Sequence, residues 1–129
     1  MQQNKEELRN EFKLRIYKFI VRLLKFLSKI PYDAVANEIK KQLTRSGTSI
    51  GANFFEARGA SSKKDFQNFF TISLKSANET CFWLSVLLDA NLIPKESVDE
   101  CKYLLKETKE IANIFASSII TMRGKRKVF

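Results

Sequence analysis

Residues 45–66 read RSGTSIGANFFEARGASSKKDF, and this stretch decides how the chain folds. Its first part predicts a helix with an unusually small face, on which Gly47 and Gly51 lie one turn apart. Glycine inside a helix costs roughly 1 kcal/mol relative to alanine, so we expect close packing against another helix to offset that cost. Gly59 is the usual residue just past a helix end, and Ser62 with an aspartate three residues later indicates a capping box. The stretch therefore predicts two helices joined by a turn of about four residues, an antiparallel helical hairpin.

Two further helices are predicted outside this hairpin. The first helix of the chain begins near Lys5 and ends at Lys29, because the residue before Pro31 avoids the helical conformation. A second short turn precedes the last helix. We expect helices at about residues 5–29, 33–58, 63–90 and 95–122. With such short connections, residues 1–122 predict an all-α, antiparallel up-down-up-down four-helix bundle, and residues 123–129 a basic tail.

Apolar residues at helical spacing mark the side of each helix that we expect in the core. In the second helix this core stripe comprises Val35, Ile39, Leu43, Ile50 and Phe54. Phe66, Phe69 and Phe70 of the third helix follow the same spacing, so we interpret them as core residues in preference to a platform for stacking bases. The two cysteines fall in predicted helices without a CxxC partner, which favours reduced core thiols over a disulfide or a redox pair.

The first helix is apolar around an unusually large part of its circumference. Its apolar residues cover an arc much wider than the roughly 100° that a helix turns toward one core. They are Ile16, Tyr17, Phe19, Ile20, Val21, Leu23, Leu24, Phe26 and Leu27. We therefore expect two burial partners, its own bundle and a second surface, most simply a neighbouring copy of the chain. The alternative is that this helix lies at the centre of a monomer.

From Phe12 onward, the same helix carries only cations on the part of its surface that is not apolar. From Phe12 to Ile30 it contains no acidic residue, and its charges recur at steps of three and four, which places them in one stripe. This stripe consists of Arg15, Lys18, Arg22, Lys25 and Lys29. A merely solvated face normally mixes both signs, as we expect for the outer face of the fourth helix with Glu100, Glu107 and Glu110. We therefore interpret the stripe as a binding surface in preference to a merely solvated face.

Composition and charge limit the possible functions. The chain has 129 residues and a formal net charge of +9, and it lacks histidine, the commonest general base and metal ligand. No segment approaches the roughly 20 apolar residues of a membrane span, and the N-terminus is too polar for a signal peptide. We expect a single-domain cytoplasmic protein that is not an enzyme and has no cofactor or metal.

Four polar residues lie beside the predicted core stripes: Arg45, Asn53, Glu56 and Glu79. An unpaired buried charge costs several kcal/mol, so we expect structural pairing, Arg45 or a lysine with Glu56 or Glu79. The alternative is acid–base chemistry or metal binding by the carboxylates, as in di-iron bundles. That architecture needs Glu-x-x-His pairs, which a chain without histidine does not supply, so structural pairing is favoured.

Motifs in the middle of the chain resemble those of a known family. They are Arg45-Ser46, Thr48-Ser49-Ile50, Ala52-Asn53, Glu56, Gly59, Ser61-Ser62-Lys63-Lys64-Asp65-Phe66, Ala77-x-Glu79-Thr80 and Trp83-Leu84. In this combination they resemble the four-helix-bundle 23S rRNA intervening-sequence protein family, which is similar to the accessory variability determinant proteins of diversity-generating retroelements. Phe55 and Arg58 depart from the family pattern, in which smaller residues are more usual. The resemblance implies a bacterial all-α bundle that assembles as a ring-like homopentamer and has no established enzymatic activity.

We interpret the chain as a non-enzymatic, homo-oligomeric protein that binds nucleic acid, with RNA favoured, through phosphate contacts. Besides the stripe on the first helix, the candidate contacts are the tail cations Arg123, Lys125, Arg126 and Lys127. The alternative is a protein-interaction scaffold that docks a reverse transcriptase, as the retroelement accessory proteins do. Both functions need a basic exterior, so the sequence leaves both open.

Overall fold

The structure, a computed structural model, describes residues 4–124 and consists of four long helices. The elements are α1 (Lys5–Ser28), α2 (Ala34–Ala57), α3 (Lys63–Asp89), a short 3₁₀ helix η1 (Lys95–Ser97) and α4 (Val98–Met122). Residues 4–124 contain no strand, so the all-α prediction is confirmed. The expected helix bounds agree closely with the observed ones, and the main difference is that η1 precedes α4.

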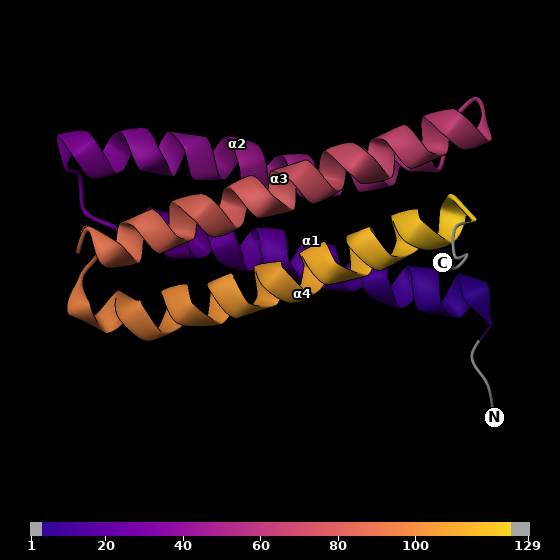
Figure 1. The fold of residues 1–129 in the computed structure, drawn as a ribbon. Helices are drawn as coiled ribbons and strands as arrows, with labels where there is room; N and C mark the ends of the chain where they lie inside the picture. Colours follow the sequence, from indigo (N-terminus) through magenta and orange to yellow (C-terminus); the bar gives the residue numbers. More distant parts are fainter. Residues whose placement is uncertain (1–3, 125–129) are drawn as a thin grey trace.

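The helices lie alongside one another and are joined at their ends (Figure 1). The α1–α2 and α3–α4 connections lie at one end of the molecule. The α2–α3 turn lies at the other end, together with the beginning of α1 and the end of α4. α3 packs closely along both α2 and α4, whereas α1 approaches α2 and α4 less closely. The first helix is therefore the one that the others enclose least.

Side-chain caps mark the beginnings of α1, α2 and α3. α1 starts with a capping box between Asn4 and Glu7, which was not expected. At α3, Ser62 Oγ accepts a hydrogen bond from the backbone N–H of Asp65 at 3.0 Å, as predicted. The Asp65 carboxylate, however, accepts from the N–H of Ser61, also at 3.0 Å, and so reaches one residue further than a capping box requires. The turn between α2 and α3 is thus closed by local hydrogen bonds.

The two helical glycines of α2 receive side chains from α1. A Cβ atom at Gly47 would overlap Leu23 Cδ2, and one at Gly51 would overlap Ile20 Cδ1. Leu23 is fully buried and cannot turn out toward solvent. The small face therefore serves helix packing as expected, with α1 as the partner, but it receives side chains of α1 and the two backbones stay further apart than those of α2 and α3.

On another side, α2 meets α3 through short hydroxyl side chains that we call the hydroxyl seam: Ser46, Ser49, Ser73, Ser76 and Thr80. Ser46 Oγ lies 2.9 Å from Thr80 Oγ1, and Ser76 Oγ donates to Ser49 Oγ at 2.9 Å. Ser73 Oγ donates to a backbone carbonyl of α2, also at 2.9 Å. Such short side chains let two helix backbones approach, and no buried side-chain polar atom within residues 4–124 lacks a partner.

Aromatic rings fill the core toward the end of the molecule where α1 begins and α4 ends. The rings of Phe54 and Phe115 lie 5.9 Å apart between their centroids. Phe12 and Phe70 contact Phe115 edge-on, with centroid distances of 5.2 and 5.3 Å. Phe70 of α3 is therefore a core residue, as predicted, whereas Phe66 and Phe69 of the same helix are only partly buried against the core.

One residue of the predicted core stripe lies outside the core. Val35 is 61% exposed, whereas Ile39 and Leu43 further along α2 are buried. The reason is its position in the first turn of α2, directly after the capping residue Asp33, at the edge of the bundle. Including Val35 in the core was therefore wrong.

Candidate nucleic-acid interface

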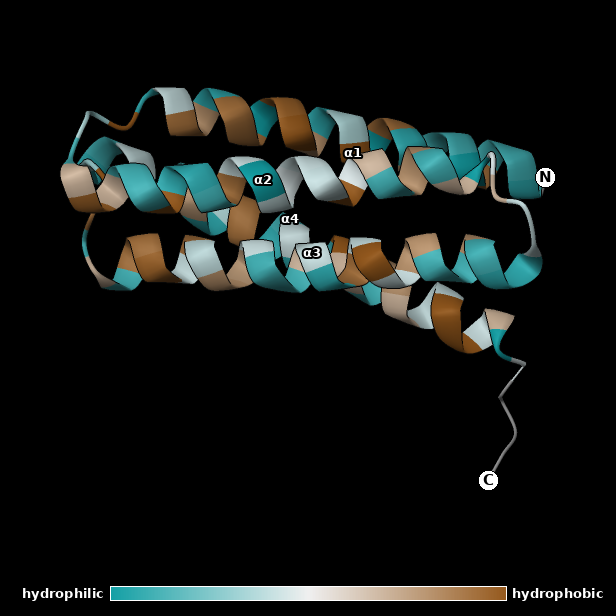
Figure 2. Cartoon of the chain, turned by 90° about the horizontal axis from the view of Figure 1, so that it is seen from above, coloured by the Kyte–Doolittle hydropathy of each residue, from teal (hydrophilic) through white to brown (hydrophobic). Residues whose placement is uncertain are grey.

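α1 has apolar residues on two sides. Its buried residues are Ile16, Phe19, Leu23, Phe26 and Leu27. On the other side Leu14, Tyr17 and Leu24 are exposed, and Val21 between them is half-buried. These four residues recur at steps of three and four and form a continuous strip, which we call the outer apolar face. Hydrophobic segments are visible along α1 in Figure 2. The excess apolar arc predicted for this helix therefore lies outside the core of the single chain.

Two of the five cations in the predicted stripe are paired with carboxylates of α4. Arg15 donates through Nε and Nη2 to the two oxygens of Glu107, at 2.7 and 2.9 Å. Its Nη2 also donates to Glu110 at 2.6 Å. Arg22 makes the same two-pronged contact with Glu100, at 2.6 and 2.9 Å. We call this set of contacts between α1 and α4 the ion-pair ladder.

The ladder corrects two expectations. The stripe on α1 does have acidic partners at Arg15 and Arg22, and the glutamates of α4 do not form a merely solvated face. The physical reason is a match in spacing, because the two arginines are seven residues apart on α1 and Glu100 and Glu107 are seven residues apart on α4. Equal spacing on two helices that lie side by side brings both pairs into contact. That match was present in the sequence and could have predicted the pairs.

The ladder keeps its members in their charged forms. Hydrogen bonds from Arg15 lower the pKa of Glu107, and hydrogen bonds from Arg22 lower the pKa of Glu100. The same bonds raise the pKa of both arginines. The Arg22 guanidinium also lies 3.8 Å from the centroid of the Tyr103 ring. Both arginines are therefore largely neutralised within the chain and offer little charge to a phosphate.

The remaining cations of the stripe are accessible. Lys18, Lys25 and Lys29 are exposed, and none forms an ion pair with another residue in the range 4–124. Lys18 and Lys25 lie beside Tyr17 and Val21 and so border the outer apolar face. Of the tail cations, Arg123 is exposed at the C-cap of α4. The others lie outside the described residues: Lys125, Arg126 and Lys127.

The four polar residues beside the core stripes do not form one site. Arg45 Nη2 contacts Glu79 Oε2 between α2 and α3, one of the pairings that the sequence allowed, and Trp83 Nε1 donates to the same oxygen at 3.0 Å. Asn53 donates to the backbone and hydroxyl of a serine one turn earlier. Glu56 is exposed and forms no ion pair within the described range, because it lies on the outward side of α2. The expectation that Glu56 needs a partner was therefore wrong.

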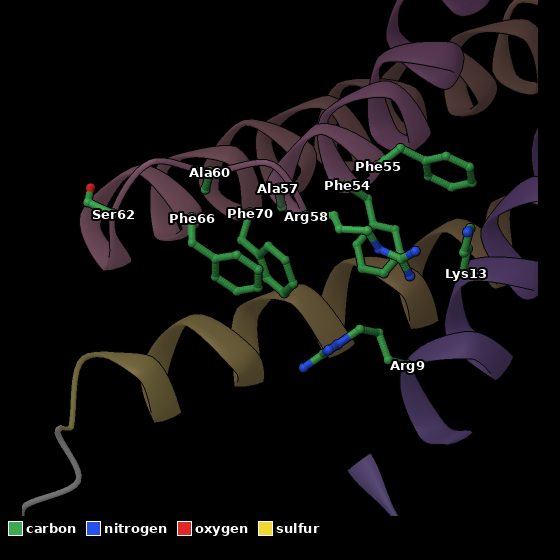
Figure 3. Close-up of a pocket in the computed structure, with 10 residues that line it drawn as sticks. All are labelled: Arg9, Lys13, Phe54, Phe55, Ala57, Arg58, Ala60, Ser62, Phe66 and Phe70. Carbon is green, nitrogen blue, oxygen red and sulfur yellow. The ribbon is translucent and has the colours of Figure 1, made fainter. Parts of the chain in front are cut away.

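A pocket of about 350 Å³ opens between the beginning of α1 and the α2–α3 turn (Figure 3). Figure 3 shows the rings of Phe54, Phe66 and Phe70 side by side, with Arg9 extending from α1 across from them. We call it the aromatic pocket; the residues important here are Phe54, Phe66, Phe70, Arg9, Lys13 and Arg58. None of the residues that line it is acidic, so the pocket combines an aromatic wall with a positive rim.

The three cations of this rim were not among the expected contacts. The sequence does contain a signal for two of them: Arg9 and Lys13 are four residues apart and therefore share one face of α1. Arg58 follows α2 as its C-cap residue, and only the packing of α1 against the α2–α3 hairpin brings it to the same opening.

Comparisons with known proteins agree with this architecture. A family model described as 23S rRNA-intervening sequence protein matches residues 10–114. The chain belongs to this family. A crystal structure of a protein of unknown function from the S23 ribosomal protein family of Bacteroides thetaiotaomicron is 37% identical in sequence, with a TM-score of 0.70. The match covers 84% of this chain and 97% of that chain. None of the curated proteins matches this chain.

In this member of the 23S rRNA-intervening sequence protein family, residues 4–124 contain no cluster of histidine, cysteine, aspartate or glutamate that could hold a metal ion. Both cysteines are free thiols. Burial raises the pKa of Cys101 to about 11 and also raises the pKa of Cys81. Neither thiol is therefore activated as a nucleophile. Within the described range, no helix is long and apolar enough to cross a lipid bilayer.

Proposed function

We propose that this protein is a non-enzymatic, cytoplasmic nucleic-acid-binding protein that contacts RNA through its phosphates. In this proposal the chain is an antiparallel up-down-up-down bundle whose copies assemble into a ring-like homo-oligomer, with five copies as the family resemblance implies. One observation carries the proposal. Lys18, Lys25 and Lys29 remain exposed on α1 and form no ion pair with another described residue, although the two arginines of the same stripe do.

The expected binding mode is electrostatic and independent of base sequence. Each chain contributes a net charge of +9, and assembly multiplies this charge on one particle. Lysine and arginine contacts to phosphates release condensed counterions, so the affinity falls steeply as salt rises. Phosphate contacts position a protein on a nucleic acid but carry no sequence information.

Self-association is supported by the outer apolar face. An exposed strip of Leu14, Tyr17 and Leu24 along one helix is typical of a surface that another protein covers. Lys18 and Lys25 border this strip. Assembly through the strip would bring lysines of neighbouring copies closer together, and bound RNA would offset their mutual repulsion.

RNA binding is tested by fluorescence anisotropy with a labelled RNA over a range of salt concentrations. We expect Lys18→Glu/Lys25→Glu to lose about tenfold more affinity than the matched control Lys102→Glu/Lys106→Glu, which makes the same charge change on α4. A second variant lacks residues 123–129. If neither the first variant nor this truncation changes the affinity, the proposal is wrong.

Assembly is tested separately by light scattering. We expect a particle several times the mass of one chain, and a monomer at micromolar concentration would contradict the ring. Tyr17→Glu/Leu24→Glu is expected to reduce the mass by placing charges on the outer apolar face. Recovery of a reverse transcriptase in a pull-down that survives nuclease treatment would favour the scaffold function.

A further inference from the structure

We propose that the aromatic pocket binds an unpaired nucleobase of the RNA, while Arg9, Lys13 and Arg58 hold the phosphates beside that base. This inference rests on the proposed function and deepens it, because it predicts a preference for single-stranded over duplex RNA. Lys18 and Lys25 bind any phosphate chain in the proposal above, whereas the aromatic pocket accepts only a base that is not paired.

The wall of the pocket offers aromatic surface. The Phe66 and Phe70 rings lie 4.8 Å apart between centroids and are tilted by 31°. Phe54 and Phe70 are nearly buried, at 8% and 9% exposure, while Phe66 is only half-buried. Phe66 therefore provides the most accessible ring of these three. Stacking on such a ring tolerates every base, because each base has a π-face.

The rim of the pocket offers positive charge from two helices. Arg9 extends from α1 and Arg58 from the end of α2, and both are exposed (Figure 3). Neither forms an ion pair within the described part of the chain, unlike Arg15 and Arg22 in the ion-pair ladder. A guanidinium that is not engaged by a carboxylate can donate two parallel hydrogen bonds to a phosphate. Lys13 Nζ lies 5.1 Å from the centroid of the Phe55 ring at the same opening.

Size and charge together select the occupant. The volume of about 350 Å³ falls in the range of roughly 300–1,000 Å³ that is typical of small-molecule sites. Three cations and no acid in the lining require an anionic ligand, and the phenylalanines require that it also carry a flat apolar part. A nucleotide within a single strand meets both requirements. A base in a duplex meets them only if its pair is broken, which costs a few kcal/mol.

The experiment compares two variants that remove the same number of charges. Arg9→Gln/Arg58→Gln alters the rim of the pocket, and Lys63→Gln/Lys64→Gln alters exposed cations at the start of α3 that do not line it. Binding of each to labelled oligoadenylate and to the oligoadenylate–oligouridylate duplex is measured by anisotropy. For the single strand, we expect the loss of affinity of the rim variant to be about tenfold larger than that of the control. For the duplex, we expect the two variants to lose equal affinity.

A third variant removes the aromatic face but keeps an apolar side chain. Phe66→Leu is expected to lower the affinity for the single strand about fivefold and to leave duplex binding unchanged, with circular dichroism checking that it folds. An oligonucleotide that carries 2-aminopurine provides a direct readout. Its fluorescence should be quenched by the unmodified protein and less by Phe66→Leu.

The outcomes separate this inference from the proposed function. If single strand and duplex bind the unmodified protein but the rim variant and the control lose equal affinity, the inference is wrong and the proposed function stands. If benzoate binds the unmodified protein but not the rim variant, while adenosine monophosphate binds neither protein, the pocket serves a small organic anion and the inference is also wrong. If the unmodified protein binds neither RNA, both proposals are wrong.

Discussion

The α2–α3 interface and the α1–α4 interface join helices by different chemistry. The hydroxyl seam consists of short, buried, neutral side chains, with Ser46 and Thr80 fully buried at its centre. The ion-pair ladder consists of long, charged side chains at the surface, where Arg15 is 34% and Arg22 is 48% exposed. The first arrangement brings backbones together, and the second connects helices that stay further apart.

The difference indicates what each interface contributes. A buried seam is sensitive to shape, because an interior packed to crystal density has no room for an added group. A ladder at the surface is screened by solvent and tolerates changes of shape, but it responds to pH and salt. We therefore expect α2 and α3 to carry the stability of the bundle, and the ladder mainly to fix how α1 lies against α4.

The largest expected effect comes from overfilling the hydroxyl seam. Ser46→Leu places a large side chain at a fully buried position between α2 and α3, and we expect it to lower the free energy of unfolding by about 3 kcal/mol. Thr44→Leu, on the exposed side of α2, is the matched control and is expected to cost little. Urea denaturation followed by circular dichroism measures both. Equal midpoints for the two variants would show that the seam is not tightly packed.

Removing one hydroxyl from the seam tests its polar part. Thr80→Val keeps the volume but removes the group that contacts Ser46 and donates to the Ser76 carbonyl at 2.8 Å. We expect a loss of about 1–2 kcal/mol, because Ser46 loses its partner across the interface. Since no ionisable group takes part, the loss should be the same at low and high salt. A loss that disappears in high salt would contradict this account.

The ladder should respond to acid in a way that the seam does not. Because the folded-state pKa values of Glu100 and Glu107 are lowered, their stabilisation is complete above the unfolded-state pKa of about 4.3 and is lost as the pH falls further. We expect a double-mutant cycle of Arg15→Gln and Glu107→Gln to give a coupling of about 1 kcal/mol at neutral pH. The coupling should approach zero at about pH 2. A coupling that persists in acid would mean that the pair contributes by packing.

The smallest expected effect concerns the more exposed rung of the ladder. Arg22→Lys keeps the charge but loses the two-pronged contact with Glu100 and the stacking on Tyr103, which should cost about 0.5 kcal/mol. Lys25→Arg is the matched control, because Lys25 forms no ion pair within residues 4–124. Thermal melts at low salt measure both. An equal change in both variants would show that the rung contributes nothing specific.

Most of the fold could be predicted because its signals are local. Pro31 marks a helix end because the residue before a proline avoids the helical conformation, and Ser62 marks a helix start because its side chain caps the backbone, so their meaning does not depend on the rest of the molecule. The small face around Gly47 predicted close packing, but only the structure identifies α1 as the partner. A partner depends on contacts between distant segments, which spacing within one helix does not specify. Val35 was misplaced for a similar reason, since spacing does not show where the bundle ends.

Less of the candidate site could be predicted. The pairing of Arg15 with Glu107 depends on two stretches far apart in the chain, so its signal is the equal spacing of arginines on α1 and glutamates on α4, and no pattern within α1 alone shows it. The aromatic pocket depends on three helices meeting at one end, so nothing in the sequence around Arg58 places it beside Arg9 and Lys13. Lys18 and Lys25 could be found because exposure on the outward side follows from helical spacing alone.

α1 packs less closely against the bundle than the other helices do, and this has a consequence for protein synthesis. α1 is translated before the helices that cover it, and the residues that receive its side chains, such as Gly47 on α2, reach the ribosome exit later. Until then both its core residues and its outer apolar face are open to the surrounding water. The nascent chain is therefore most vulnerable to aggregation when only its first helix has emerged, and we expect its yield in cells to depend on chaperones that bind apolar nascent segments.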